Sequence, residues 1–408
     1  MKMEKRPPFI LKLPVVLLMA AMLAIGTGLA KGQDSSPSSA PGRNIGRFFD
    51  KLRAGRSVTI GFLGEGATYG LGASRPGREF RSLITLWLRA QYPNARIETI
   101  DASVPGTGSL YGTLRLRRDL LASKPDLVLI EFGLSDAAEN QVVVRKAIEG
   151  MLRQLLVVPQ PPEIVLLHPA SPDRIVPTEA SKSMAGQYGI PTIDLQSALR
   201  PMIESGSLTT ATLWPRNNAA AGALTDAGHQ LYADRIIDFL KQQSTLAATP
   251  LARNIPPPVA SDELNYGELR ALAESRTEPG ASAPNGAVWK KERSDDPHSP
   301  TLLMVSDRPG ATLETYFEGT VVGLTFIKGR SAGMIEVLID GQPAPAPLRI
   351  VDCYDERTGL GTAIIAGGLP LGEHKLTIRL LPGRHPRSRG QEVKLGYLII
   401  GGQRPEKL

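Results

Sequence analysis

The stretch SVTIGFLGEGATYG, residues 57–70, decides the fold. Residues 58–63 form a short, mainly apolar run that is typical of a buried strand, and a glycine-rich turn follows. We expect the next helix to begin near Gly77. In an open parallel sheet, the turn after the first strand is a usual site of chemistry. This turn, which includes Gly66, is therefore the first place to look for functional residues.

The first thirty residues differ from the rest of the chain. Basic residues precede an apolar run over 13–25, and small residues follow before Lys31. This pattern predicts a signal peptide over 1–30, which engages the membrane before it is removed. The alternative is an uncleaved anchor, but Pro14 and the early glycines leave the run short for a membrane span. We expect a secreted or periplasmic protein, or a membrane-anchored one if the segment is retained.

Composition restricts the stabilising bonds and the partners. The chain has 408 residues, enough for two domains, and its one cysteine, Cys353, allows no intramolecular disulfide bond. The net charge of +7 becomes smaller when the signal peptide is removed, so it is weak evidence for a polyanionic partner. The sequence has no zinc-ligand spacing, phosphate loop or nucleic-acid motif. We predict no metal, no cofactor and no nucleic-acid partner.

Apolar runs alternate with helical patterns from residue 46 to residue 243. We expect strands at residues 58–63, 95–100, 126–132, 163–168 and 192–195, and helices at residues 78–91, 110–122, 140–156, 179–188 and 226–243. Five strands that alternate with helices imply a parallel sheet with helices on both faces. Residues 46–243 thus predict a three-layer α/β domain, preceded by a flexible Ser/Pro/Gly-rich spacer over 31–45.

The composition and the periodicity change after residue 243. Residues 244–285 are rich in proline and alanine and predict a linker, interrupted by a short helix over 262–274. Over 286–406 the period is two, with turns such as Asp340-Gly341. We expect strands at residues 313–317, 321–328, 334–339, 348–351, 362–365, 375–381 and 393–400. Many short strands without a helix indicate an all-β antiparallel sandwich.

Four stretches of the first domain resemble the motifs of the SGNH or GDSL-like hydrolases. They are LGEGATYG at 63–70, DASVPGTGSLYGTLRLRRDLL at 101–121, KPDLVLIEFGLSDA at 124–137 and LTDAGHQLYAD at 224–234. The C-terminal stretches GATLETYFEGTVVGL, IEVLIDGQ, LGEHKLTIRLL and VKLGYLII resemble the accessory sandwich of secreted two-domain members. The resemblance implies a flavodoxin-like domain with a parallel sheet, a jelly-roll-like β-sandwich after it, and acyl or acetyl ester hydrolysis.

Esterases of this family use a serine after the first strand, an Asp-x-x-His pair, and an oxyanion hole made of N–H groups and an asparagine. The first motif places the serine at Gly66, which has no nucleophilic atom. The glycine of the second motif is Gly106, so its backbone donor is retained, and the asparagine of the third is Ser135, a shorter donor. The fourth motif places the aspartate at Ala220 and the histidine at Ala223.

A rival alignment takes Asp226 and His229 as the catalytic pair, since their spacing is right. Asp226 also stands where a helix N-cap belongs, and we favour that interpretation. Thr68 and Ser74 are possible substitute nucleophiles, although hydroxyls in such turns more often cap a helix or bond to the backbone. His168 ends a strand, where it either reaches the cleft or makes a structural hydrogen bond.

Two carboxylates and one basic run remain. Glu65 replaces a small residue of the motif, and we expect an exposed turn carboxylate or, alternatively, a group that fills or charges the vacated pocket. Glu131 ends an apolar strand and is expected to be paired inside the domain. The run RHPRSR at 384–389 predicts a solvated β-turn; its alternative is a contact for acidic glycans or the cell surface.

These positions predict a pseudoenzyme: a secreted SGNH-like protein, catalytically impaired or inactive, that binds acylated polysaccharide or another glycan of the cell envelope. The alternative is an active acyl or acetyl esterase that acts on acylated carbohydrate through a site rebuilt from Thr68, His168, Asp226 or His229. A third interpretation is a structural component of the envelope. The glycan assignment rests on analogy with the family.

Overall fold

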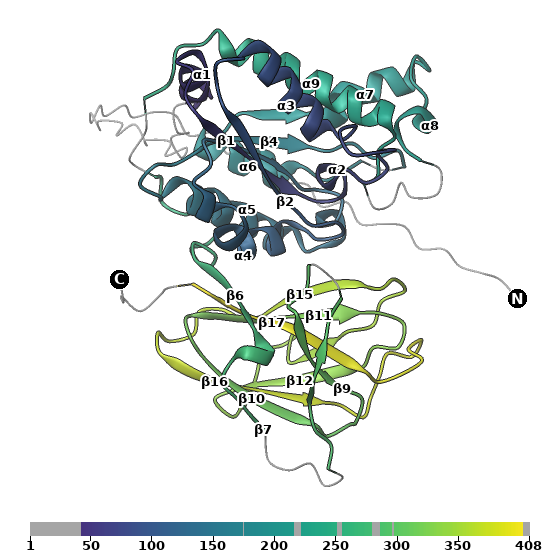
Figure 1. The fold of residues 1–408 in the computed structure, drawn as a ribbon. Helices are drawn as coiled ribbons and strands as arrows, with labels where there is room; N and C mark the ends of the chain where they lie inside the picture. The colour runs from purple at the N-terminus through teal and green to yellow at the C-terminus, as the bar shows by residue number, and fades with distance from the viewer. Residues whose placement is uncertain are drawn as a thin grey trace, which may run out of the picture. The chain divides into compact units, whose positions relative to one another are not determined.

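The computed structural model describes residues 42–173, 175–215, 222–250, 255–279, 286–295 and 298–402. The predicted signal peptide over 1–30 and most of the predicted spacer over 31–45 lie outside these ranges. Along the chain, a group of α/β elements comes first and a group of β-strands follows (Figure 1). Within the described ranges, none of the helices has the length and apolar character needed to cross a membrane.

A five-stranded parallel sheet forms the centre of the first group, in the order β2-β1-β3-β4-β5. The strands are β1 Val58–Gly64, β2 Ile97–Ser103, β3 Leu127–Glu131, β4 Glu163–His168 and β5 Thr192–Asp194. All five predicted strands form, with β2 shifted towards the C-terminus. This strand order is that of flavodoxin-like folds, in which the winding reverses between β1 and β3.

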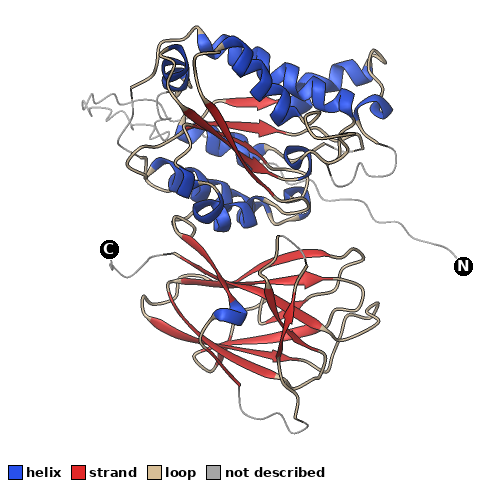
Figure 2. Ribbon diagram, viewed as in Figure 1, coloured by secondary structure: helices blue, strands red, loops and turns tan. Residues whose placement is uncertain are grey.

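Helices cover both faces of this sheet (Figure 2). One face packs against α1 Gly46–Arg53, α3 Phe80–Gln91, α7 Leu195–Glu204, α8 Thr210–Leu213 and α9 Asp226–Ser244. The other packs against α4 Ser109–Asp119, α5 Gln141–Leu156 and α6 Glu179–Tyr188. In β3, Leu127 and Leu129 enter the first core, whereas Val128 and Ile130 enter the second. A strand buried on both faces needs such a continuous apolar run.

Several helical boundaries differ from the prediction. Helix α3 begins at Phe80 rather than near Gly77, and the helix expected over 110–122 ends at Asp119, followed by the 3-10 helix η1, Leu121–Ser123. The short helices α1, α7 and α8 were not expected. Asp194 caps α7 by accepting from the N–H of Ser197 at 2.9 Å. Asp194 is both the last residue of β5 and the N-cap of α7, so no loop residues separate the strand from the helix in the sequence.

Two antiparallel sheets enclose one core in the second group. One sheet runs β13-β12-β16-β10-β7 with β14 on β12, and the other runs β15-β11-β17-β9-β8 with β6 on β17. The strands are β6 Gly267–Ala271, β7 Thr277–Pro279, β8 Lys290–Arg293, β9 Leu302–Ser306, β10 Thr312–Glu318, β11 Val321–Lys328, β12 Met334–Ile339, β13 Gln342–Pro343, β14 Ile350–Asp352, β15 Gly359–Ala366, β16 Glu373–Leu380 and β17 Val393–Gly401. Asp340 and Gly341, with φ of 51° and 79°, form the expected hairpin turn.

The predicted helix over 262–274 is wrong. Residues 267–271 are β6, paired with β17 from Gly267–Gly401 to Ala271–Tyr397, and only Leu272–Glu274 form a 3-10 helix, η4. Pairing with a neighbouring strand overrides the local helix propensity of this segment. Strand β8 was missed because all four of its residues are exposed and show no alternation. The sandwich strands therefore begin inside the segment predicted to be a linker.

Gly323 of β11 provides a test of the sandwich register. A Cβ at this position would overlap the carbonyl oxygen of Ala363 on β15, at a point where the register shifts. We expect Gly323→Ala to lower the free energy of unfolding by about 1–3 kcal/mol, measured by urea denaturation. Gly359→Ala is the matched control, because a Cβ at Gly359 has nothing within 4 Å. Equal losses in the two variants would contradict the register.

Candidate functional site

The carboxyl ends of β1 and β3 lie side by side and carry the first and third motifs. Gly64 of β1 is in register with Glu131 of β3. The chain then continues from β1 into the short helix α2, Gly66–Tyr69, and from β3 into the loop 132–135. Open α/β sheets bind ligands at the point where the winding reverses, which is here between β1 and β3. The structure thus brings the first and third motifs together at this edge of the sheet.

Gly66 is buried at the first position of α2, directly after the N-cap residue Glu65. Another part of the chain crosses close to it. A Cβ on Gly222 would lie 3.7 Å from the Cα of Gly66 and 3.5 Å from the backbone nitrogen of Ala67. The N–H of Leu224 fixes this crossing by donating to the carbonyl of Leu71 at 2.8 Å. The position of the family nucleophile therefore has no reactive atom and has backbone packed beside it.

Glu65 is 2% exposed, so the expectation of an exposed turn carboxylate is wrong. Its Oε1 accepts from the N–H groups of Gly133 and Leu134 at 3.0 and 2.8 Å. Its Oε2 accepts from the N–H of Ser135 at 3.1 Å and from the Ser135 hydroxyl at 2.5 Å. This carboxylate joins the turn after β1 to the loop after β3. The sequence pattern gave no sign of these bonds beyond the unusual size of Glu65 in the motif.

Ser135 occupies the position of the asparagine in the oxyanion hole. Its hydroxyl carries one proton, and that proton is donated to Glu65, as is the backbone N–H. Neither donor of Ser135 is therefore directed at a substrate oxygen in this arrangement. Because serine replaces asparagine here, the donor lies on a shorter side chain and points toward Glu65.

Thr68 and Glu131 form a second buried pair beneath the turn. Glu131 Oε2 accepts from the Thr68 hydroxyl at 2.7 Å and from the Thr68 N–H at 3.3 Å. The expectation that Glu131 is paired inside the domain is confirmed. A hydroxyl that donates to a carboxylate has the arrangement of an activated nucleophile, but Thr68 is only 1% exposed. A buried hydroxyl of this kind is not accessible to an ester.

Burial raises the pKa of all three carboxyl groups at this edge. It raises the pKa of Glu131 to about 8, with the nearby charge of Glu65 adding to the shift. Burial also raises the pKa of Glu65 to about 7, against the hydrogen bond from Ser135, and the pKa of Asp136 to about 6, against the N–H of Ser109. Four donors favour the anion of Glu65. Glu131 Oε1 has no partner among the described residues, so fewer donors stabilise the anion of Glu131 than that of Glu65.

His229, the base of the rival alignment, is fully buried and bonded on both sides of its ring. Its Nδ1 accepts from the N–H of Phe80 at 3.4 Å, and its Nε2 donates to the carbonyl of Leu71 at 3.2 Å. Burial lowers the pKa of His229, which favours this neutral form. Neither nitrogen remains to take a proton from a nucleophile. His229 fixes the segment before α3 to the start of α9.

Asp226 serves the same local structure. Its carboxylate accepts from the N–H and the hydroxyl of Ser74 at 2.8 and 2.6 Å, and hydrogen bonding from Ser74 lowers its pKa. The predicted N-cap is displaced by one residue: Thr225 caps α9 by accepting from the N–H of Gly228 at 3.1 Å, and Asp226 is the first helical residue. Ser74, considered as a substitute nucleophile, is thus bonded to Asp226.

His168 ends β4 and makes a structural hydrogen bond, which is one of the two roles predicted for it; the other was to reach the cleft. Its side chain is fully buried, with Nε2 3.1 Å from the hydroxyl of Ser181 on α6. Burial lowers its pKa to about 4, so it is neutral under ordinary conditions. The ring packs toward a covering helix and takes no part in the edge formed by β1 and β3.

The remaining motif positions differ in exposure. Gly106 lies in the loop after β2 and is exposed, with φ of +71° and open space where a side chain would begin. Ala223 is fully buried. Ala220 lies outside the described residues. Among the residues that the structure does describe, no group of three or more His, Cys, Asp or Glu side chains is arranged to hold a metal ion.

The carboxyl pair predicts how stability depends on pH. The folded-state pKa values of Glu65, about 7, and Glu131, about 8, lie above the ordinary value of 4.5. At a pH between the ordinary and the raised value, these two groups therefore bind more protons in the folded protein than in the unfolded chain. The free energy of unfolding should therefore fall as the pH rises from about 6.5 to about 8, above the range in which the lowered pKa values of the buried His168 and His229 oppose this trend.

Glu131→Gln is the informative variant, because an amide still accepts from Thr68 but does not ionise. Urea denaturation at several pH values should give a flatter profile for this variant than for the unchanged protein. Parallel profiles would show that Glu131 does not carry the proton.

Comparisons with known proteins agree with this architecture. Residues 62–231 match the model of the GDSL-like lipase/acylhydrolase family. No curated protein sequence gives a significant match. The crystal structure of a two-domain esterase (CEX) active on acetylated mannans aligns with a TM-score of 0.75 and 21% identity, over 90% of this chain and 98% of that one. A two-domain esterase (CEX) co-crystallised with mannopentaose aligns with a TM-score of 0.74 and 21% identity, over 90% and 97% of the two chains.

The family model and the structural likeness cover different lengths of the chain. The family model spans the segment from β1 into α9, which includes all the motif positions. The structural likeness extends over the parallel sheet and the antiparallel sandwich together. Over residues 62–231, the α/β domain therefore matches the GDSL-like lipase/acylhydrolase family.

Proposed function

We propose that this protein is an exported SGNH-family protein that does not hydrolyse esters by the family mechanism and serves as a glycan-binding protein of the cell envelope. The observation that supports the absence of ester hydrolysis is the pairing of Glu65 with Ser135 beside Gly66. The N-terminal pattern over 1–30 supports export. The two-domain architecture supports the glycan part.

Ester hydrolysis of this kind needs a nucleophile, a base within hydrogen-bond reach and donors aimed at the developing oxyanion. Gly66 provides no nucleophile, and the donors of Ser135 already serve Glu65. His229 uses both ring nitrogens on backbone groups, and His168 bonds to Ser181. Each group that the family mechanism requires is thus missing or bonded elsewhere. The hydroxyl–carboxylate pair of Thr68 and Glu131, which a rebuilt esterase site could use, is buried.

The proposal that this protein binds a glycan rests on its structural similarity to the two-domain esterase CEX. That esterase is active on acetylated mannans, and one of its structures was obtained with mannopentaose. The ligand edge of the sheet is retained here, with Gly106 exposed beside it. A family member that keeps this edge but lacks the nucleophile would retain a glycan without cleaving it.

The direct test compares hydrolysis and binding by the same purified, mature protein. With p-nitrophenyl acetate and with acetylated mannan, we expect release of p-nitrophenol and acetate at the rate of a buffer blank. With mannopentaose and acetylated mannan, we expect measurable binding by calorimetry or affinity electrophoresis. Turnover that disappears in His229→Ala, with folding verified by circular dichroism, would contradict the proposal and favour the rebuilt esterase.

A gain-of-function variant provides the matched comparison. The triple change Gly66→Ser, Ala220→Asp, Ala223→His restores the serine, aspartate and histidine of the family motifs. We expect weak esterase activity, above the rate of the unchanged chain, because Ser135 still donates to Glu65 instead of to an oxyanion. A triple variant that stays inactive while it folds and binds acetylated mannan would show that the edge has lost more than these side chains.

A further inference from the structure

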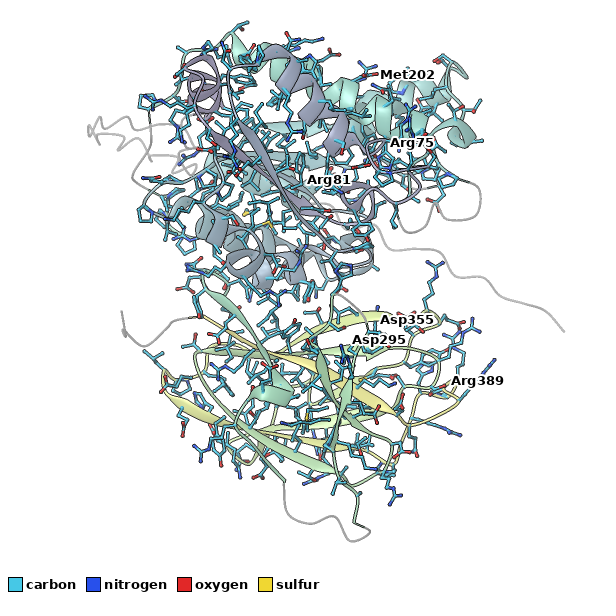
Figure 3. The ribbon with its side chains drawn as sticks, viewed as in Figure 1. Arg75, Arg81, Met202, Asp295, Asp355 and Arg389 are labelled. Carbon is cyan, nitrogen blue, oxygen red and sulfur yellow. The ribbon has the colours of Figure 1, made fainter. Side chains whose placement is uncertain are left out.

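Three loops of the sandwich gather basic side chains at one end. They are residues 328–333, 352–358 and 382–391, which we call the arginine platform. Together they carry six basic side chains, Lys328, Arg330, Arg357, Arg384, Arg387 and Arg389, and three acidic ones, Asp352, Asp355 and Glu356. Figure 3 labels Asp355 and Arg389, which lie toward the same end of this sandwich.

Hydrogen bonds hold these loops in place. The buried hydroxyl of Ser388 donates to the carbonyl of Ala332 at 2.8 Å, and the N–H of Arg389 donates to the carbonyl of Arg330 at 2.8 Å. Gly390 packs so closely that a Cβ there would lie 2.8 Å from the carbonyl oxygen of Ser331. The predicted β-turn does form, with the N–H of Ser388 donating to the carbonyl of His385 at 2.8 Å. The arginines therefore project from fixed backbone.

The cations of the platform outnumber the carboxylates that neutralise them. Glu356 accepts from Arg387 at 2.7 Å and lies 3.6 Å from Arg330, so one carboxylate serves two guanidinium groups. The side chains of Arg330 and Arg387 remain 56% and 68% exposed. Arg384 and Arg389 are also exposed and form no ion pair with another residue in the described part of the chain. The platform carries a net positive charge that faces water.

A flat aromatic pair lies among these cations. The rings of Tyr354 and His385 stack with centroids 4.1 Å apart and an interplanar angle of 3°. The guanidinium of Arg387 lies 5.6 Å from the centroid of the Tyr354 ring. Both rings are half-buried and so held in position while part of each stays accessible. Rigid aromatic surfaces offer apolar contact to the faces of sugar rings.

We propose that the arginine platform binds an anionic polysaccharide whose sugars carry carboxylate or sulfate groups. Guanidinium groups bind both anions through paired N–H donors, and the fixed loops reduce the entropy lost on binding. The aromatic pair between the arginines favours a sugar polymer over a bare polyphosphate. The expected export places the platform where such polymers occur. This inference goes beyond the proposed function, because it assigns a second ligand to the sandwich and does not depend on the α/β site.

The test measures binding of the full mature chain to three polymers: polygalacturonate for carboxylates, dextran sulfate for sulfates, and neutral dextran. We expect binding to at least one anionic polymer, none to dextran, and weakening as salt increases. The variant R384A/R387A/R389A should bind at least tenfold more weakly, with a smaller salt dependence. Tyr354→Ala should weaken binding severalfold without changing the salt dependence, because it removes no charge.

The matched control is K290A/K291A/R293A, which removes three exposed cations from β8 in the same sandwich. It should bind the anionic polymer as the unchanged protein does. An equal loss in this control, no binding to either anionic polymer, or equal affinity for double-stranded DNA or anionic lipid vesicles would overturn the proposal. Mannan binding by the arginine variant should stay unchanged, which separates this result from the test of the α/β site.

Discussion

The structure of the candidate site depends on a buried carboxylate. Glu65 brings a carboxyl group to a position with 2% exposure, and a buried polar group is tolerated only when hydrogen-bond partners surround it. The loop after β3 supplies them through three N–H groups and the hydroxyl of Ser135. The turn after β1 is thereby fixed to the loop after β3, which places Gly66 and α2. Burial raises the pKa of Glu131 at the end of β3, which disfavours a second buried charge directly beneath.

The same bonds that hold this edge together remove the groups that an esterase needs. Ser135 stabilises Glu65 instead of an oxyanion, and His229 joins two backbone segments instead of receiving a proton. Gly66 therefore lies beside an ordered hydrogen-bond network that joins Glu65 to Ser135. The fold of the family persists because it depends on strand order and apolar cores, which are independent of the catalytic side chains.

The fold was largely predictable from the sequence, and the hydrogen bonding of the site was not. Continuous apolar runs such as 126–132 identified the buried strands, because burial on both faces requires them. The helix expected over 262–274 failed because pairing with β17 outweighs local propensity. Motif spacing located Gly66 and Ser135 correctly at one edge. It did not reveal that Glu65 is buried, because its donors come from a segment sixty-eight to seventy residues away in the chain.

The central claim is that the α/β domain contains no activated nucleophile, and reaction with a fluorophosphonate tests it most directly. The mature protein would be incubated with an excess of the reagent, and its intact mass compared with that of the triple variant carrying Gly66→Ser, Ala220→Asp and Ala223→His. The account predicts an unchanged mass for the natural sequence. A stoichiometric adduct on any serine or threonine of residues 46–243, Thr68 and Ser74 included, would contradict it.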